Sequence, residues 1–170
     1  MSSLELRAAA LSDAPAMLTL LRCASQEGDT LPFLNELDHD FITSQWLQAP
    51  ACVVACRGGV VLGMYRYGTI MPGRGSHICT ATFVVKLDAR GQGIGRALVT
   101  HCINAAQASG YQGMQLNQVV STNSAALSLY SSLGFTQAGC IPDAFKHDRL
   151  GYVSAYIMYR RLRQNEVQGD

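Results

Sequence analysis

The residues best suited to chemistry lie near the middle of the chain, in the run Arg90-Gly91-Gln92-Gly93-Ile94-Gly95-Arg96. An apolar segment precedes this run, and a helical pattern begins inside it. Three glycines within five residues allow the backbone to approach a ligand closely. The free N–H groups and the dipole of a helix N-terminus favour an anion. The run therefore predicts a phosphate or pyrophosphate site, and hence a phosphate-bearing cofactor.

Three kinds of phosphate loop compete for this run, and the spacing of the glycines separates them. A P-loop requires G-x-x-x-x-G-K-S/T, but the run has no such lysine. A dinucleotide loop requires G-x-G-x-x-G, but counting from Gly91 and Gly93 places Arg96 in the third position. An NAD-type oxidoreductase is therefore disfavoured. The pattern that remains is Arg90-x-x-Gly93-x-Gly95.

This pattern, between a strand and a helix, resembles the Q/R-x-x-G-x-G/A pyrophosphate loop of the GCN5-related N-acetyltransferase (GNAT) family. A second run, from Asn123 to Phe135, is similar to the family segment N-x-x-A-x-x-x-Y-x-x-x-G-F at every matching position. The two segments occur in the family's order. Arg7 and the helix after Ser12 also resemble the family's opening strand and helix, so the likeness spans nearly the whole chain, although only the two segments are specific.

The resemblance assigns the cofactor contacts to two stretches of the chain. Phe83, Val84 and Val85 would present backbone groups to the pantetheine arm and the thioester carbonyl of acetyl-CoA. The residues that would surround the pyrophosphate are Arg90, Gly91, Gln92, Gly93, Ile94, Gly95 and Arg96. Acetyl-CoA is therefore the acyl donor that the resemblance implies.

The second matching segment would complete the cofactor site and supply a catalytic group. By resemblance, Asn123 would hydrogen-bond the pantetheine region and Ala126 would allow close packing there. Tyr130, seven residues after Asn123, would protonate the departing CoA thiolate. A phenol with an ordinary pKa of about 10 stays neutral at working pH and gives a proton to such a leaving group.

The attacking amine must also lose a proton, because an ammonium group has no lone pair. The sequence offers several candidates for the general base and does not choose among them. His77 opens the strand expected to line the thioester, and Asn117 lies on the neighbouring strand. Glu27 and Asp29 lie in a loop expected to border the acceptor. A water molecule is a further alternative.

Other reactive side chains are expected to have structural roles, and no metal site is predicted. His39 lies between Asp38 and Asp40, but adjacent helical residues point to different faces, and no H-E-x-x-H follows. The polar residues from Asp143 to Arg149 predict a solvated connection. Six scattered cysteines form no C-x-x-C pair and are expected to be buried, reduced thiols: Cys23, Cys52, Cys56, Cys79, Cys102 and Cys140.

Hydrophobic periodicity predicts the elements that must position these residues. A strand over 4–7 leads into a helix that begins near Ser12 and Pro15, and a loop follows over 26–35. Further helices are predicted over 38–47, 94–109 and 124–133, and further strands over 52–56, 60–70, 77–85, 114–120, 136–141 and 152–159. The short connections between 52 and 85 indicate an antiparallel meander.

These elements predict a mixed α/β fold. The GNAT resemblance makes it a central, mostly antiparallel twisted sheet of about seven strands with helices on both faces. With 170 residues, 48% of them hydrophobic, the chain is expected to form a single GNAT-like domain over 1–163, followed by a polar C-terminal tail over 164–170. The order of the strands is not determined by the sequence.

Charge and hydropathy exclude several classes of partner. A net charge of +1 and a pI of 7.6 give no electrostatic reason to expect nucleic acid. No apolar window reaches the ~20 residues of a membrane span, and no signal peptide is evident, so a cytoplasmic protein is expected. The resemblance implies a homodimer through sheet edges or C-terminal strands, and the apolar segment 152–159 is compatible with it.

Together these observations predict an acetyl-CoA-dependent N-acetyltransferase that moves an acetyl group directly to a primary amine. The absence of a G-x-S-x-G motif agrees with direct transfer, without a covalent enzyme intermediate. The alternative is a non-catalytic CoA-binding sensor or interaction module. The acceptor, a small molecule or a peptide amine, is left open.

Overall fold

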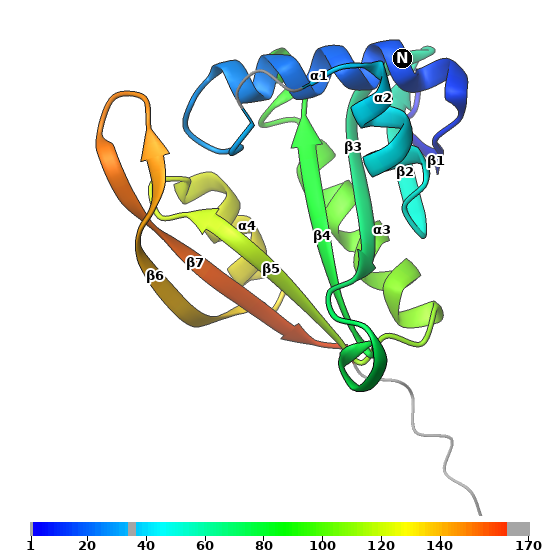
Figure 1. The fold of residues 1–170 in the computed structure, drawn as a ribbon. Helices are drawn as coiled ribbons and strands as arrows, with labels where there is room; N and C mark the ends of the chain where they lie inside the picture. The colour runs from blue at the N-terminus through cyan, green and yellow to red at the C-terminus, as the bar shows by residue number, and fades with distance from the viewer. Residues whose placement is uncertain (1, 34–36, 163–170) are drawn as a thin grey trace, which may run out of the picture.

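The computed structural model describes residues 2–33 and 37–162 of the chain. Within them, one seven-stranded sheet has the order β1-β2-β3-β4-β5-β7-β6 (Figure 1). All neighbouring strands are antiparallel except β4 and β5. The strands are β1 (Glu5–Ala8), β2 (Ala51–Arg57), β3 (Val60–Thr69), β4 (Ile78–Val85), β5 (Gly113–Val120), β6 (Thr136–His147) and β7 (Gly151–Arg161).

Helices cover both faces of this sheet, and alternate strand residues face opposite layers. On one face α1 (Ala14–Gln26), the short α2 (His39–Phe41) and the π-helical η2 (Ile42–Leu47) pack over a core that includes Trp46 and Met64. On the other face α3 (Ile94–Ala108) and α4 (Ser124–Ser132) pack over a core that includes Tyr65 and Leu98. Adjacent residues of β3, Met64 and Tyr65, therefore belong to different cores.

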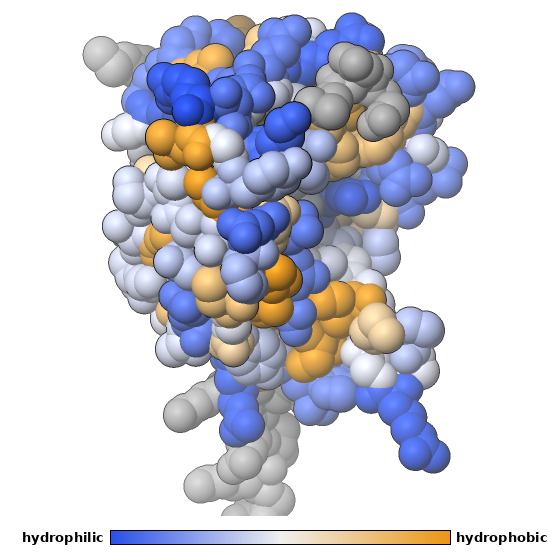
Figure 2. Space-filling model, turned by 60° about the vertical axis from the view of Figure 1, so that its left-hand side comes forward, coloured by the Kyte–Doolittle hydropathy of each residue, from blue (hydrophilic) through white to orange (hydrophobic). Residues whose placement is uncertain are grey.

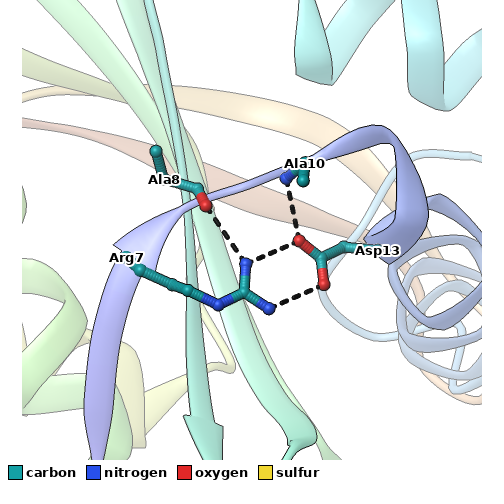
Figure 3. A network of polar contacts seen from close by, with 4 residues as sticks. All are labelled: Arg7, Ala8, Ala10 and Asp13. Carbon is teal, nitrogen blue, oxygen red and sulfur yellow. Dashed lines mark hydrogen bonds and ion pairs between the residues drawn. The ribbon is translucent and has the colours of Figure 1, made fainter.

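A partly buried ion pair joins β1 to the start of α1 (Figure 3). Arg7 Nη1 and Nη2 donate to the two carboxylate oxygens of Asp13 at 2.7 and 2.9 Å. The backbone N–H of Ala10 also donates to Asp13, at 2.8 Å, and Arg7 donates to the Ala8 carbonyl. The hydrogen bonds from Arg7 hold the pKa of Asp13 below its ordinary value. This network orients the start of α1 against the sheet edge.

The sheet opens in its middle, between β4 and β5. These strands pair only at Ile78 with Gly113 and Cys79 with Met114. Beyond those pairs they diverge, while β5 remains paired with β7 along most of its length (Figure 1). The facing backbone edges of β4 and β5 are therefore left without a neighbouring strand beyond these two pairs.

The predicted mixed α/β fold, its meander and its helices on both faces are confirmed. One local prediction is wrong: Asp143 to Arg149 is not wholly a solvated connection, because β6 continues to His147. A bulge with φ of 51° at Asp143 interrupts the pairing, and Phe145 and His147 beyond it are buried. Interspersed polar residues concealed this continuation. The predicted tail, 164–170, lies outside the described residues.

Candidate active site

A cleft of about 420 Å³ occupies the opening between β4 and β5. Five parts of the chain meet there: both strands, the loop after α1, the turn before α3, and α4. A volume above ~300 Å³ is typical of a ligand site. The predicted residues that line the cleft are Phe83, Val84, Val85, Arg90, Gly91, Gly95, Asn123, Ala126 and Tyr130.

The glycine-rich turn presents unpaired backbone donors at the N-terminus of α3. Gly93 is the N-cap, with a φ of 81°, and no side chain caps the helix. The first backbone bond of the helix runs from Ala97 N to Gly93 O, so the amides of 91–96 have no acceptor within the described parts of the chain. A Cβ atom added at Gly91 or Gly93 would meet nothing within 4 Å. This open array of N–H groups fits a phosphate or pyrophosphate.

The remaining predicted residues of this turn brace it. Gln92 donates to the Asp88 carbonyl at 3.2 Å and accepts a hydrogen bond from Arg57 at 3.0 Å. Arg96 donates to Ser132 Oγ at 2.8 Å, which links α3 to α4. Ile94 is buried in the core. Their side chains thus hold the turn, and Gln92, Gly93, Ile94 and Arg96 do not themselves line the cleft.

Arg90, which lines the cleft, forms a bidentate ion pair with Glu27. Its Nη1 and Nη2 donate to Glu27 Oε1 and Oε2 at 2.8 and 2.6 Å. Glu27 follows α1, so the pair joins the loop after α1 to the glycine-rich turn. Glu27, a candidate general base, is thereby occupied by a guanidinium.

Asn123 and Tyr130 reach the cleft from α4. Asn123 is the N-cap, and its Oδ1 accepts a hydrogen bond from Ala126 N at 3.1 Å, which leaves the amide nitrogen available. The Tyr130 ring lies between Phe83 and Phe135, with centroid distances of 6.2 and 5.7 Å. Its hydroxyl has no hydrogen-bond partner among the described residues. Desolvation raises the pKa of Tyr130, which keeps the phenol protonated.

On β4 the side chains pack into the two cores, whereas one backbone edge faces the cleft. Val84 is 3% exposed, and its side chain belongs to the core under α1. Phe83 faces the opposite layer and contacts the rings of Tyr65 and Tyr130. With their side chains packed into the cores, these residues turn toward the cleft a backbone edge that β5 does not pair with.

The structure separates the candidates for general base. His77 precedes β4 at the end where β4 and β5 are joined, and it does not line the cleft. Asn117 does line it and accepts a hydrogen bond from Gln115 at 2.8 Å. Asp29 is outside the lining, and its Oδ1 is buried without a hydrogen-bond partner.

The sequence reasoning placed the loop over 26–35 beside the acceptor but named Glu27 and Asp29 in it, and it missed the bulge of β5. The segment Thr30–Phe33, after α1, lines the cleft beside the predicted residues. Gln118 has a φ of 53° at a bulge between Leu116 and Val119 of β5, where both Gln118 and Asn117 face the cleft. Nothing in the alternation of β5 marks this bulge, because a polar pair within a strand also reads as an ordinary exposed stretch.

Comparison with known proteins places this cleft in context. The family model for the acetyltransferase (GNAT) family matches residues 16–135. The N-acetyltransferase aca1 of Schizosaccharomyces pombe is 39% identical over 100 residues, which cover 57% of this chain and 47% of that protein. The chain thus spans about half the length of that relative.

Two further proteins are similar over most of their length. An L-methionine sulfoximine/L-methionine sulfone acetyltransferase of Pseudomonas paraeruginosa is 32% identical over 148 residues, covering 82% of this chain and 84% of that protein. The structure of a GCN5-related N-acetyltransferase from Kribbella flavida has a TM-score of 0.89 and 37% identity, covering 94% of this chain and 98% of that one. Sequence and fold agree in pointing to one family.

Proposed function

The chain belongs to the acetyltransferase (GNAT) family, and from this premise we propose that it transfers the acetyl group of acetyl-CoA directly to a primary amine. The observation that carries the proposal is the cleft itself. It brings together the glycine-rich turn at the N-terminus of α3, through Gly91 and Gly95, an unpaired strand edge and a protonated tyrosine. A simple turn or a purely structural tyrosine would not require these three features together.

The chemistry of the cleft fits acetyl-CoA along its whole length. When bound, acetyl-CoA supplies an activated thioester. The amides from Gly91 to Arg96 would bind its pyrophosphate, with Arg90 adding positive charge. The free edge of β4 at Phe83–Val85 would bind the amide groups of the pantetheine arm as a neighbouring strand does, and the Asn123 amide nitrogen would add a donor.

Tyr130 would act as the general acid. As the acceptor nitrogen forms its bond to the thioester carbon, the C–S bond breaks and the Tyr130 hydroxyl gives its proton to the sulfur. Tyr130 suits this step because it lines the cleft, and its hydroxyl has no hydrogen-bond partner among the described residues and carries its proton before the sulfur leaves. The proton released by the amine would leave through water near Asn117, since Glu27 is paired with Arg90.

The acceptor is a primary amine in this proposal. The Pseudomonas relative is named for L-methionine sulfoximine and L-methionine sulfone, both of which carry such an amine. The yeast and Kribbella proteins are named only as N-acetyltransferases. These names support the proposal that this protein transfers the acetyl group to a nitrogen atom of its acceptor.

The proposal is tested first by isothermal titration calorimetry with acetyl-CoA, with NAD and ATP as comparison ligands. We expect selective micromolar binding of acetyl-CoA, followed by release of free CoA when amines are added. Absence of acetyl-CoA binding would refute the proposed cofactor site. Binding without CoA release from any amine would favour the non-catalytic CoA-binding module instead.

We also propose a cytoplasmic homodimer. All six cysteines are unpaired, as expected in a reducing compartment, and no helix of the described residues could cross a membrane.

The apolar segment 152–159 lies in β7, between β5 and β6, so β6 provides the exposed edge on that side. Apolar patches on this side are small and separate (Figure 2). Analytical ultracentrifugation tests the dimer, and a concentration-independent monomer would exclude it.

A further inference from the structure

A second recess, of about 320 Å³, lies next to the cleft and shares part of its wall. Ala81 and Thr82 of β4 line both spaces. The second recess is closed on its other sides by β3 and by residues of η2 and the turn after it. It therefore reaches the cleft from the side opposite α3 and α4, away from the turn proposed to bind the pyrophosphate.

Arg66 is the charged residue of this recess. It lies on β3, is half-buried, and its guanidinium is 5.5 Å from the centroid of the Trp46 ring. It donates one hydrogen bond, to the Gln45 carbonyl. Over residues 2–33 and 37–162, no carboxylate forms an ion pair with it. A guanidinium has five N–H donors in a planar fork, so most of its donors are available.

The surroundings of Arg66 favour an anion over a cation. None of the described residues that line either recess is Asp or Glu. Burial lowers the pKa of the Arg66 guanidinium, which reflects the cost of holding a desolvated charge without a counterion. An arginine nevertheless stays protonated at neutral pH. A carboxylate entering this recess would relieve that cost through paired, charge-assisted hydrogen bonds.

Arg66 is close to the proposed reaction centre. Its partner across the β3–β4 ladder is Thr82, and directly opposed side chains in a sheet are about 5 Å apart at Cβ. Thr82 immediately precedes Phe83, the first of the residues proposed to hold the thioester. The hydroxyls of Thr80 and Thr82 share this face and have no hydrogen-bond partner among the described residues. An amine at the thioester would thus place its adjoining atoms beside Thr82 and Arg66.

We propose that Arg66 binds the carboxylate of the acceptor, so that the protein acetylates free amino acids at the α-amine. The inference rests on the proposed acetyl transfer and adds the class of acceptor. In an amino acid a single carbon separates the amine from the carboxylate, which suits two neighbouring sites on adjacent strands. Polyamines and other polycations would find no carboxylate in either recess to neutralise their charge.

The test measures CoA release with a panel of L-amino acids and with the α-amides of the same amino acids. Each amide keeps the amine and the side chain and removes only the negative charge. We expect kcat/KM for the best amino acid to exceed that for its amide by at least tenfold. In Arg66→Gln this ratio should fall toward one, while Arg66→Lys should retain part of it. Comparing ratios between proteins cancels the different basicities of the two amines.

Controls separate binding of the acceptor from support of the fold. Arg161→Gln removes an exposed arginine of β7 and should leave the ratio unchanged. The acetyl-CoA dissociation constant of Arg66→Gln should equal that of the wild type, since Arg66 lies outside the cofactor cleft. If Arg66→Gln does not fold, the wild-type ratio and the Arg66→Lys ratio still decide the question.

The outcomes distinguish the two proposals. Equal use of amino acids and amides by the wild type would overturn the carboxylate site but leave acetyl transfer intact. The same holds if Arg66→Gln keeps the wild-type ratio, or if only amines without a carboxylate, such as spermidine, are acetylated. Binding of acetyl-CoA with no CoA release from any amine would instead refute acetyl transfer, and the acceptor class with it.

Discussion

Two arginine–carboxylate pairs in this protein have the same two-bond geometry and arginines of similar exposure, 40% and 42%, but they differ in the burial of the carboxylate. Arg7 and Asp13 join residues six positions apart at the closed edge of the sheet, and the Asp13 side chain is only 9% exposed. Arg90 and Glu27 join residues 63 positions apart beside the cleft, and the Glu27 side chain is 21% exposed.

This difference in carboxylate burial indicates which pair stabilises the fold and which pair belongs to the candidate site. Asp13 is nearly buried and receives a third hydrogen bond, from the Ala10 backbone, so its loss leaves three donors without their acceptor. Glu27 holds an exposed guanidinium beside backbone amides that lack acceptors. Solvent screens that pair, and an anion can compete for Arg90. We call the surroundings of Arg7 and Asp13 the closed region and those of Arg90 and Glu27 the open region. The pair in the closed region stabilises the fold, whereas Arg90 in the open region can exchange Glu27 for a ligand anion.

The largest effect is expected in the open region, from Tyr130→Phe. Loss of the general acid should lower kcat by about 100-fold, whereas the dissociation constant of acetyl-CoA should change little because the ring is kept. Steady-state kinetics and calorimetry measure the two quantities. Tyr152→Phe removes an exposed hydroxyl outside the cleft and is the matched control. Wild-type turnover in Tyr130→Phe would exclude Tyr130 from the mechanism.

The next effect belongs to the closed region, where Asp13→Asn should destabilise the fold by about 1–3 kcal/mol without altering kcat. Urea unfolding measures this change. The pKa of Asp13 is lowered in the folded state, so its stabilisation is present above the unfolded value near ~4 and is lost as pH falls through the folded value. The difference between wild type and variant should therefore shrink below about pH 4.

Asp88→Asn is the control for that measurement. Asp88 pairs with Lys86 at 2.8 Å, but its side chain is 70% exposed. Removing this pair should change stability by less than about 0.5 kcal/mol. Equal effects of the Asp13 and Asp88 substitutions would contradict the contrast between buried and exposed pairs.

A third effect returns to the open region, where Gly93→Val should weaken acetyl-CoA binding by at least about tenfold, or roughly 1.4 kcal/mol. A β-branched residue is strained at a φ of 81°, and its side chain would cover the amides at the helix N-terminus. Gly73→Val introduces the same residue at a φ of 62°, also in open space, and is the control for strain. If both variants bind acetyl-CoA equally well, the glycine-rich turn does not hold the cofactor.

The smallest effect is expected from Glu27→Gln. Releasing Arg90 should lower the acetyl-CoA dissociation constant by about threefold and steepen its salt dependence, while stability changes by less than about 1 kcal/mol. Calorimetry at several salt concentrations checks this, with Asp88→Asn as a control for charge nearby. Destabilisation as large as that of Asp13→Asn would show that both pairs serve the fold.

Most of the elements and the glycine-rich turn beside the cleft were predictable from the sequence, because they depend on local patterns. The helix after Gly93 and the segment from Asn123 to Tyr130 carry their glycine, cap and periodicity signals within a few residues. The continuation of β6 past Asp143 was missed because a bulge interrupts the pairing and shifts which side chains are buried. The role of Arg66 depends on Thr82 and Trp46, which are distant in sequence.

The sequence by itself determined the class of fold, the glycine-rich turn and the tyrosine seven residues after its asparagine, since spacing along one helix or turn fixes which groups share a face. Only the tertiary structure decided that β4 and β5 part after two residue pairs, that Glu27 pairs with Arg90, and that Arg66 lines the neighbouring recess without an ion pair among the described residues. These depend on strand order and on contacts between segments far apart in the chain, which no local pattern records.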